Sequence, residues 1–259
     1  MSFMKFARAL ATLLATTFAG TAIAADVTPG EAWDATVKTR QLFLETTVGP
    51  LPHDIMKMLN MTGVWPGGGL YVIPARRLGP NLAVYTTFGL TNPDMPTTVQ
   101  MTGFRLDADG QRASAAAGTL QRKTPAPKPP GASGYGYELF VVAAPGQGWP
   151  LNLLQWAVNA EIIHDVGLLA RVDKYDGLTV ERVGVGPGLS VNVLIARARP
   201  PLPTGTNLVE GRMDVLVATT ITDDEMQWSM KNGRAALLDK LRDAGVGQVS
   251  VLERDSVVQ

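Results

Sequence analysis

The spacing of hydrophobic residues changes once near the middle of the chain, and the change separates two elements. Residues 135–144 are mostly aromatic, β-branched or small, with Tyr137 and Leu139 on one face, which predicts a strand buried on most of both faces. Pro145 interrupts this pattern because proline lacks a backbone donor. From residue 150 onward the apolar positions recur every three to four residues. A core strand is therefore expected to lead into a core-facing helix.

The same two periodicities predict most of the other elements. Short apolar or alternating runs predict strands at residues 70–73, 82–88, 99–106, 111–121, 168–172, 178–183, 189–198, 213–219 and 249–252. Helical spacing predicts helices at residues 31–48, 51–62 and 234–243.

Two helices carry signals beyond their spacing. Thr222 and Glu225 form the sequence pattern of a capping box, so a helix is expected to begin there and to be interrupted at Asn232 and Gly233. For the helix at 31–48, the spacing predicts an apolar face and a polar face, the latter with Lys38, Arg40 and Glu45.

The first 24 residues have the pattern of a secretory signal peptide. Lys5 and Arg8 precede an apolar run at residues 9–19, and small residues lead to a predicted cleavage site between Ala24 and Ala25. The run is far shorter than the roughly 20 residues of a spanning helix, so no permanent membrane anchor is expected after cleavage. The expected organisation is a signal peptide at 1–24 and a domain at 25–259, in a protein that is periplasmic or secreted.

Composition narrows the class of partner. The chain has no cysteine, 46% hydrophobic residues and a formal net charge of zero, which is typical of a folded globular domain. Near neutrality argues against a nucleic-acid-binding surface, and Arg76 and Arg77 are interpreted as a solvated pair.

Candidate catalytic chemistry is sparse. The two histidines, His53 and His164, are far apart in sequence, and no cysteine is present as a nucleophile or metal ligand. Glu161 and His164 are spaced by one helical turn, as in half of a carboxylate-bridged metal site. The alternative is that His164 interacts with the dipole at a helix C-terminus. We therefore expect no catalytic, cofactor-binding or metal site. The rival hypothesis is an envelope hydrolase or metal enzyme that uses Glu161 and His164.

The aromatic residues around the central strand and helix leave three interpretations open. They fill the core, form a wall that contacts a partner, or line a cleft for a small ligand, and core packing is favoured. The candidate partner-binding residues are Tyr135, Tyr137, Trp149 and Trp156.

Five short motifs, in order and in spacing, resemble the Suppressor of fused domain family. They are YTTFGL at 85–90, GYGYEL at 134–139, WPLNLLQ at 149–155, ITDDE at 221–225 and NGRAALL at 232–238. The resemblance extends over about residues 33–257. It implies a single α+β domain with a mixed, mostly antiparallel β-sheet flanked by helices, and no known enzymatic activity.

The resemblance also implies that the partner is another protein. Animal members of the family sequester transcription factors, and bacterial members are often proposed as immunity proteins against toxins. The predicted export signal and the expected lack of the additional C-terminal domain of the animal members separate this chain from the cytosolic role. The leading hypothesis is an exported, non-enzymatic protein-binding module, immunity-like or sequestering, that recognises an extended segment or a shaped surface.

Overall fold

The computed structural model describes residues 29–53, 68–95, 97–106, 113–122 and 130–258. The signal-like segment at 1–24 and most of the predicted helix at 51–62 lie outside these residues. Within them, no helix is both long and apolar enough to cross a membrane.

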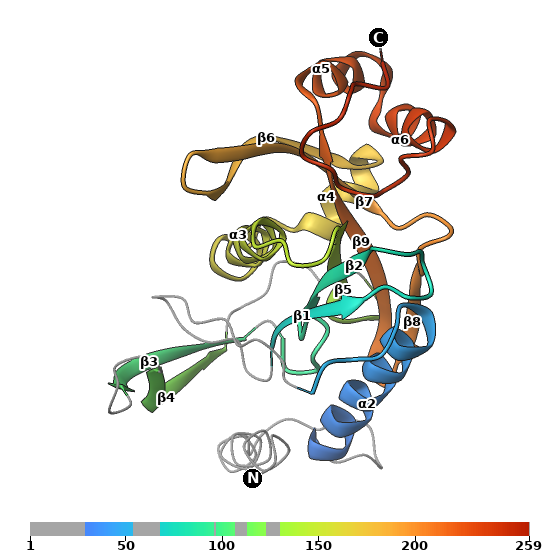
Figure 1. Cartoon of the computed structure of the whole chain (residues 1–259). Helices are drawn as coiled ribbons and strands as arrows, with labels where there is room; N and C mark the ends of the chain where they lie inside the picture. The colour runs from blue at the N-terminus through green and yellow to red at the C-terminus, as the bar shows by residue number, and fades with distance from the viewer. Residues whose placement is uncertain (1–28, 54–67, 96, 107–112, 123–129, 259) are drawn as a thin grey trace.

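One mixed sheet of seven strands forms the centre of the described structure (Figure 1). Its main strand order is β1-β2-β5-β9-β7-β6, and β8 pairs with β9 beside that path. Only the pairing of β5 with β9 is parallel, and all its other pairings are antiparallel. The strands are β1 (Gly69–Pro74), β2 (Ala83–Phe88), β5 (Ala132–Ala143), β6 (Leu178–Gly186), β7 (Leu189–Arg197), β8 (Gly205–Leu208) and β9 (Gly211–Ile221). The two remaining strands, β3 (Thr97–Leu106) and β4 (Ala113–Arg122), form a separate antiparallel hairpin.

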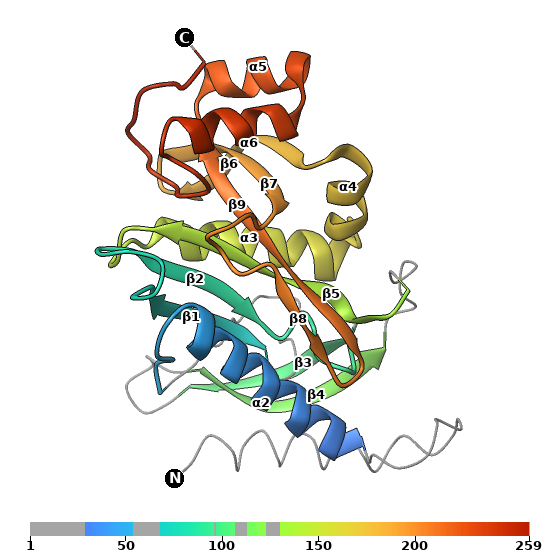
Figure 2. The same cartoon turned by 90° about the vertical axis from the view of Figure 1, so that its right-hand side faces the viewer.

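Helices cover both faces of the sheet because alternate strand residues are apolar on each face. Leu139 and Val141 of β5 pack in one core with α3 (Trp149–His164) and α4 (Leu168–Tyr175), whereas Phe140 and Val142 pack in a second core with α2 (Pro29–Thr47). A third core joins α5 (Asp223–Asn232) and α6 (Arg234–Asp243) to β7. In Figure 2 these two helices lie at one end of the molecule, and α2 and the β3–β4 hairpin at the other. The predicted α+β fold with a mixed, mostly antiparallel sheet is confirmed.

Most predicted elements are confirmed with small changes at their ends. The central strand is β5 and the helix after it is α3. The capping box is present, because the Glu225 backbone N–H donates to Thr222 Oγ1 at 3.2 Å and the Thr222 N–H donates to the Glu225 carboxylate at 2.9 Å. The strand β8 has no counterpart among the predicted elements.

Two predicted strands are wrong. Residues 168–172 lie in the helix α4, because the Glu161 carboxylate accepts hydrogen bonds from the Gly167 and Leu168 N–H groups and so caps the start of that helix. Residues 249–252 form only one isolated bridge, between Val249 and Val142, and Ser250 contacts the sheet through single hydrogen bonds to Val142 O and from the Thr220 N–H, so no strand ladder forms.

The prediction that Arg40 lies on the polar face of its helix is also wrong. Its side chain is fully buried and ion-paired with Glu138 of β5 at 3.2 Å, and its guanidinium lies 3.8 Å from the centre of the Phe88 ring. A second donor of Arg40 reaches Asn92 Oδ1 at 2.9 Å. The helix α2 is therefore fixed to the sheet by a charge as well as by apolar packing. Lys38 and Glu45 are exposed, as predicted.

Candidate binding groove at the β1–β2 connection

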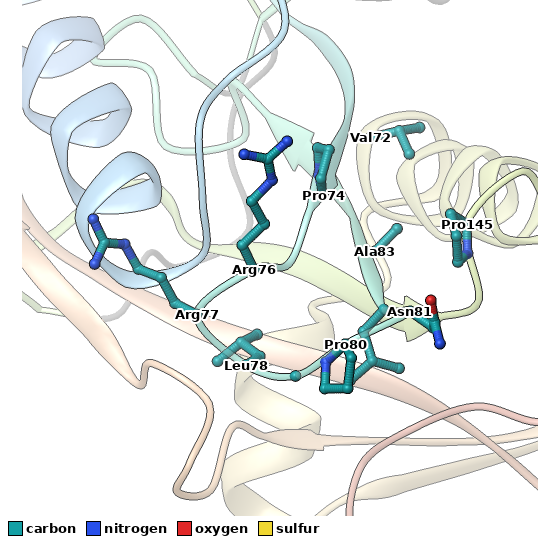
Figure 3. A pocket seen from close by; sticks show the side chains of 11 residues that line it. Val72, Pro74, Arg76, Arg77, Leu78, Pro80, Asn81, Ala83 and Pro145 are labelled. Carbon is teal, nitrogen blue, oxygen red and sulfur yellow. The ribbon is translucent and has the colours of Figure 1, made fainter.

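An open groove of about 680 Å³ lies where β1 turns into β2 (Figure 3). Val72 and Pro74 of β1, the connection from Arg76 to Leu82, and Ala83 of β2 form most of it. Pro145, which follows β5, completes the lining. The groove thus combines two segments that are about 60 residues apart in sequence, because β2 and β5 are neighbours in the sheet.

The chain builds the connection from a compact turn. The Ala75 N–H donates to Leu82 O at 2.9 Å, and the Leu78 N–H donates to Ala75 O at the same distance. Asn81 has a φ of 59°, in the left-handed region that asparagine tolerates better than most residues. Pro74 and Pro80 offer no backbone donors, so the lining presents carbon atoms where other residues would present N–H groups.

The end of α2 holds this turn from behind. The Arg77 side chain donates from Nε to the carbonyl oxygen of Glu45 at 3.1 Å, and its backbone N–H donates to Val48 O at 3.2 Å. In Figure 3 the Arg77 side chain reaches toward the helix. The positive charge of the guanidinium at this position also interacts favourably with the partial negative charge of the helix C-terminus. Because Arg40 fixes α2 to the sheet, the groove rests on a rigid support.

Arg76, the second arginine of the groove, differs from Arg77 in its contacts. Arg76 is exposed, and although its backbone N–H donates to Pro74 O at 2.9 Å, its side chain makes no hydrogen bond or ion pair with the residues that the structure describes. Among the described residues, the groove lining contains no aspartate or glutamate, so both charged groups in that lining are cations. Its remaining side chains are valine, proline, leucine, alanine and one asparagine. This is an apolar floor with a cationic rim.

This lining is suited to binding and carries no group for covalent or acid–base catalysis. In the part of the lining that the structure describes there is no serine, threonine, histidine, carboxylate, lysine or tyrosine side chain. An arginine keeps its proton at any physiological pH, so it is a poor general base but a good partner for a carboxylate.

The four aromatic residues singled out from the sequence lie elsewhere. Tyr137 and Trp149 are buried in the core between the sheet and α3, and Tyr135 and Trp156 are partly buried against the same core. None of the four lines the groove. Their packing agrees with the interpretation favoured from sequence, and a role in partner binding stays a prediction.

The tyrosines surround a buried carboxylate. The Tyr137 hydroxyl donates to Glu161 at 2.7 Å, and burial together with this negative charge raises the pKa of Tyr137. Burial also raises the pKa of Tyr135, and the nearby Glu161 and Asp165 carboxylates add to the effect. Tyr137 therefore stays a neutral donor, which is the form that a buried carboxylate needs.

Glu161 and His164 do not form a common site. Glu161 is buried and already accepts from Tyr137, Gly167 and Leu168, whereas His164 is exposed in the last turn of α3. Across the described part of the chain, no three histidine or carboxylate side chains are placed to hold one metal ion. The spacing that suggested a ligand pair puts one residue toward the core and the other toward solvent.

From sequence, Arg76 and Arg77 are interpreted as a solvated pair, with no connection to a site. A signal for the site was present: a proline follows the predicted strand at 70–73, and two adjacent cations and then a Gly-Pro turn come shortly after it. Pro145 could not have been added to this group from sequence, because it joins the groove only through the pairing of β2 with β5.

The fold and the groove together define an α+β protein with an open surface groove and a buried ion pair between helix and sheet. The model of the family described as "Suppressor of fused protein (SUFU)" matches residues 52–255, well over half of the chain. The chain belongs to the Suppressor of fused family. Among curated proteins no sequence matches it.

Solved structures agree with this assignment at the level of the fold. The structure described as the Sufu-Fu complex matches with a TM-score of 0.57 and 19% identity over 86% of this chain and 92% of that chain. Drosophila Suppressor of Fused matches with a TM-score of 0.54 and 18% identity over 86% of this chain, which spans half of that protein. A putative SUFU homolog from Neisseria gonorrhoeae matches with a TM-score of 0.52 and 15% identity over 88% of this chain and 97% of that chain.

Proposed function

We propose that this chain is a non-enzymatic module that binds another protein, and that the groove at the β1–β2 connection contacts that partner. The observation that carries the proposal is the lining of the groove, which joins exposed apolar side chains to two arginines and includes no catalytic group. Exposed apolar surface beside fixed charges is typical of protein recognition sites. Family membership supports the same class of function, because one solved family structure is described as a complex of Sufu with Fu.

The test needs a variant that changes the groove and leaves the core intact. Pro145 is exposed and lines the groove, so Pro145→Lys places a long cationic side chain in it. Pro187, in the connection between β6 and β7 at the opposite edge of the sheet, is an equally exposed turn proline and gives the matched control Pro187→Lys. The wild type, Pro145→Lys and Pro187→Lys are each crosslinked in the native host, and the proteins that each one captures are compared by mass spectrometry. A partner captured by the wild type and by Pro187→Lys, but lost with Pro145→Lys, is the expected result; equal capture by all three contradicts the groove as the contact surface.

We further propose that the protein is exported and acts by sequestering its partner, as an immunity protein does. The pattern of residues 1–24 supports export, and the lack of catalytic groups in the groove supports action by occupancy. Intact mass of the protein recovered from the cell envelope gives its N-terminus, which is expected at Ala25. A recovered chain that still contains residues 1–24 contradicts export with cleavage. A gene for a secreted toxin beside this one would support the immunity-like role.

A further inference from the structure

The groove holds positive charge that the protein itself does not neutralise. Among the described residues, no carboxylate lines the groove and none is a counter-ion of the Arg76 side chain. Several arginines elsewhere in the described structure are paired with carboxylates: Arg197 with Asp173 and Asp214, Arg199 with Asp239, and Arg254 with Glu225. In a chain with zero formal net charge, two arginines in an acid-free groove mark a local anion preference.

The arginines differ in how they are held. Arg77 is fixed by its hydrogen bond from Nε to the end of α2, so its terminal nitrogens keep a defined position. Arg76 is exposed and unpartnered among the described residues, and it is free to turn toward a ligand. In Figure 3 the two guanidinium groups point apart, so Arg76 is the one available to a carboxylate, which accepts two hydrogen bonds from a single guanidinium fork.

The apolar floor lies directly beside these charges. Leu78, Pro80 and Leu82 occupy the same turn as the arginines, and Val72 and Pro145 continue the apolar surface across the groove. Free phosphate or a nucleic-acid backbone would use the charges and leave this floor uncovered. An extended polypeptide with an apolar side chain next to an acidic one would use both.

We propose that the groove recognises a linear segment of the partner in which an aspartate or glutamate adjoins one or two apolar residues. The acid contacts Arg76, and the one or two apolar side chains cover Leu78, Leu82 and Val72. This inference rests on the proposed function, because it names the chemistry of the partner that the module binds. The apolar contact supplies affinity, and the arginine contact selects the acidic neighbour.

The experiment uses the full chain and a random library of linear peptides displayed on phage, so no knowledge of the partner is needed. Peptides enriched on the wild type are expected to carry Asp or Glu next to Leu, Ile, Val, Phe or Pro. Enrichment of basic peptides, or no enrichment, overturns the inference.

A synthetic peptide of the enriched sequence then gives a dissociation constant by fluorescence polarisation. Arg76→Glu combined with Arg77→Glu is expected to weaken binding by about tenfold or more, since a charge-assisted contact is lost and a repulsion is added. Raising the salt from about 0.05 to 0.5 M is expected to weaken wild-type binding in the same direction. The matched control is Arg182→Glu, an exposed arginine on β6 at the opposite edge of the sheet, which is expected to leave binding unchanged.

Two further measurements separate the possible failures. The single variant Arg76→Glu removes no contact within the described structure, so it serves if the double variant does not fold. Inorganic phosphate is added as a competitor. If it displaces the peptide completely at a concentration about equal to that of the peptide, the groove is a general anion site and the peptide assignment is overturned. If the crosslinked partner is captured equally by wild type and double variant, the inference about the groove fails while protein binding itself stands. If neither peptides nor a partner are recovered, both fail.

Discussion

Glu138 collects five hydrogen bonds, and this explains how a charged pair exists inside the protein. Besides Arg40, its carboxylate accepts from the hydroxyls of Thr87 and Thr91, both at 2.6 Å, and from the N–H groups of Gly89 and Thr91, at 3.0 and 3.1 Å. Burial lowers the pKa of Arg40, and the Glu138 charge opposes that effect. A buried charge is tolerated when it is paired and its remaining lone pairs are satisfied.

Glu138→Ala is therefore expected to be strongly destabilising. It leaves the Arg40 charge buried without its partner and removes the acceptor of two hydroxyls and two N–H groups. The free energy of unfolding, measured by urea denaturation, should fall by about 3–5 kcal/mol. Glu181→Ala, an exposed glutamate on β6, is the control and should change it by less than about 0.5 kcal/mol. Equal small effects of both changes would show that the buried pair contributes little.

Tyr137→Phe tests the second buried carboxylate, that of Glu161, because the change removes only the hydroxyl group that donates to it. The change removes the donor to Glu161 at 2.7 Å and keeps the aromatic packing. The loss in unfolding free energy is expected to be about 1–3 kcal/mol, because a buried charged acceptor is left with fewer partners. Trp156→Phe, at a partly buried position on α3, offers a comparison in which packing changes without loss of that hydrogen bond. A Tyr137→Phe protein as stable as the wild type would contradict the role of the hydroxyl.

Elements that are stabilised by contacts between residues close in sequence could be predicted from the sequence. Features that depend on residues of another element could not. The start of α5 was predicted because Thr222 and Glu225, three residues apart, satisfy each other. By contrast, residues 168–172 are apolar enough for a strand, and they form α4 because Glu161 of the preceding helix accepts their first N–H groups. Arg40 is buried although its position predicts the polar, solvent-exposed face of the helix. Periodicity shows which residues share a face of a helix, but it does not show which element packs against that face. The partner of Arg40 lies 98 residues away.

The family motifs around residues 85–90 and 134–139 are explained by one close approach of two chain segments. The Tyr135 N–H donates to Leu90 O and the Ser133 hydroxyl to Thr91 O, both at 2.8 Å. Gly134 lies between them with a φ of 56°, and a Cβ there would be 2.3 Å from Leu90 O. The start of β5 thus requires glycine for both backbone angle and space.

Gly134→Ala should consequently disturb this junction far more than its size suggests. Strain in φ and a clash with a backbone oxygen are expected to lower the unfolding free energy by about 3 kcal/mol or more. Gly148→Ala makes a matched comparison, since a Cβ there meets no atom within 4 Å and its φ is −87°. That control should be neutral or stabilising by up to about 1 kcal/mol. Thermal unfolding of the two variants decides the matter, and similar midpoints would contradict the clash.

At the scale of the whole molecule, Glu225 connects the last residues of the chain to the core. It is fully buried and accepts from the Arg254 guanidinium and from the Val257 N–H in addition to its own helix cap. The C-terminal segment also places Val257 and Val258 against the core under α5 and α6. One glutamate thus both starts a helix and fixes the chain end.

This arrangement gives the protein a defined sensitivity to acid. Burial alone would raise the pKa of Glu225, but hydrogen bonds from Arg254 and from the Val257 and Thr222 N–H groups outweigh it, so the pKa is lowered from 4.5. The stabilisation is therefore present above the unfolded value of 4.5 and is lost as the pH falls below it. Urea midpoints measured from about pH 7 to pH 3 should fall at the acid end, and less steeply in Glu225→Gln. An identical pH profile for the variant would contradict this assignment.

The position of β9 has a consequence for the order of events during synthesis. This strand lies between β5 and β7 in the middle of the sheet, although residues 211–221 come late in the chain. A ribosome that has made everything up to β8 has produced a half-sheet whose β5 edge has no neighbour, and an unpaired edge invites association with other chains. Completion must wait until almost the entire polypeptide has emerged.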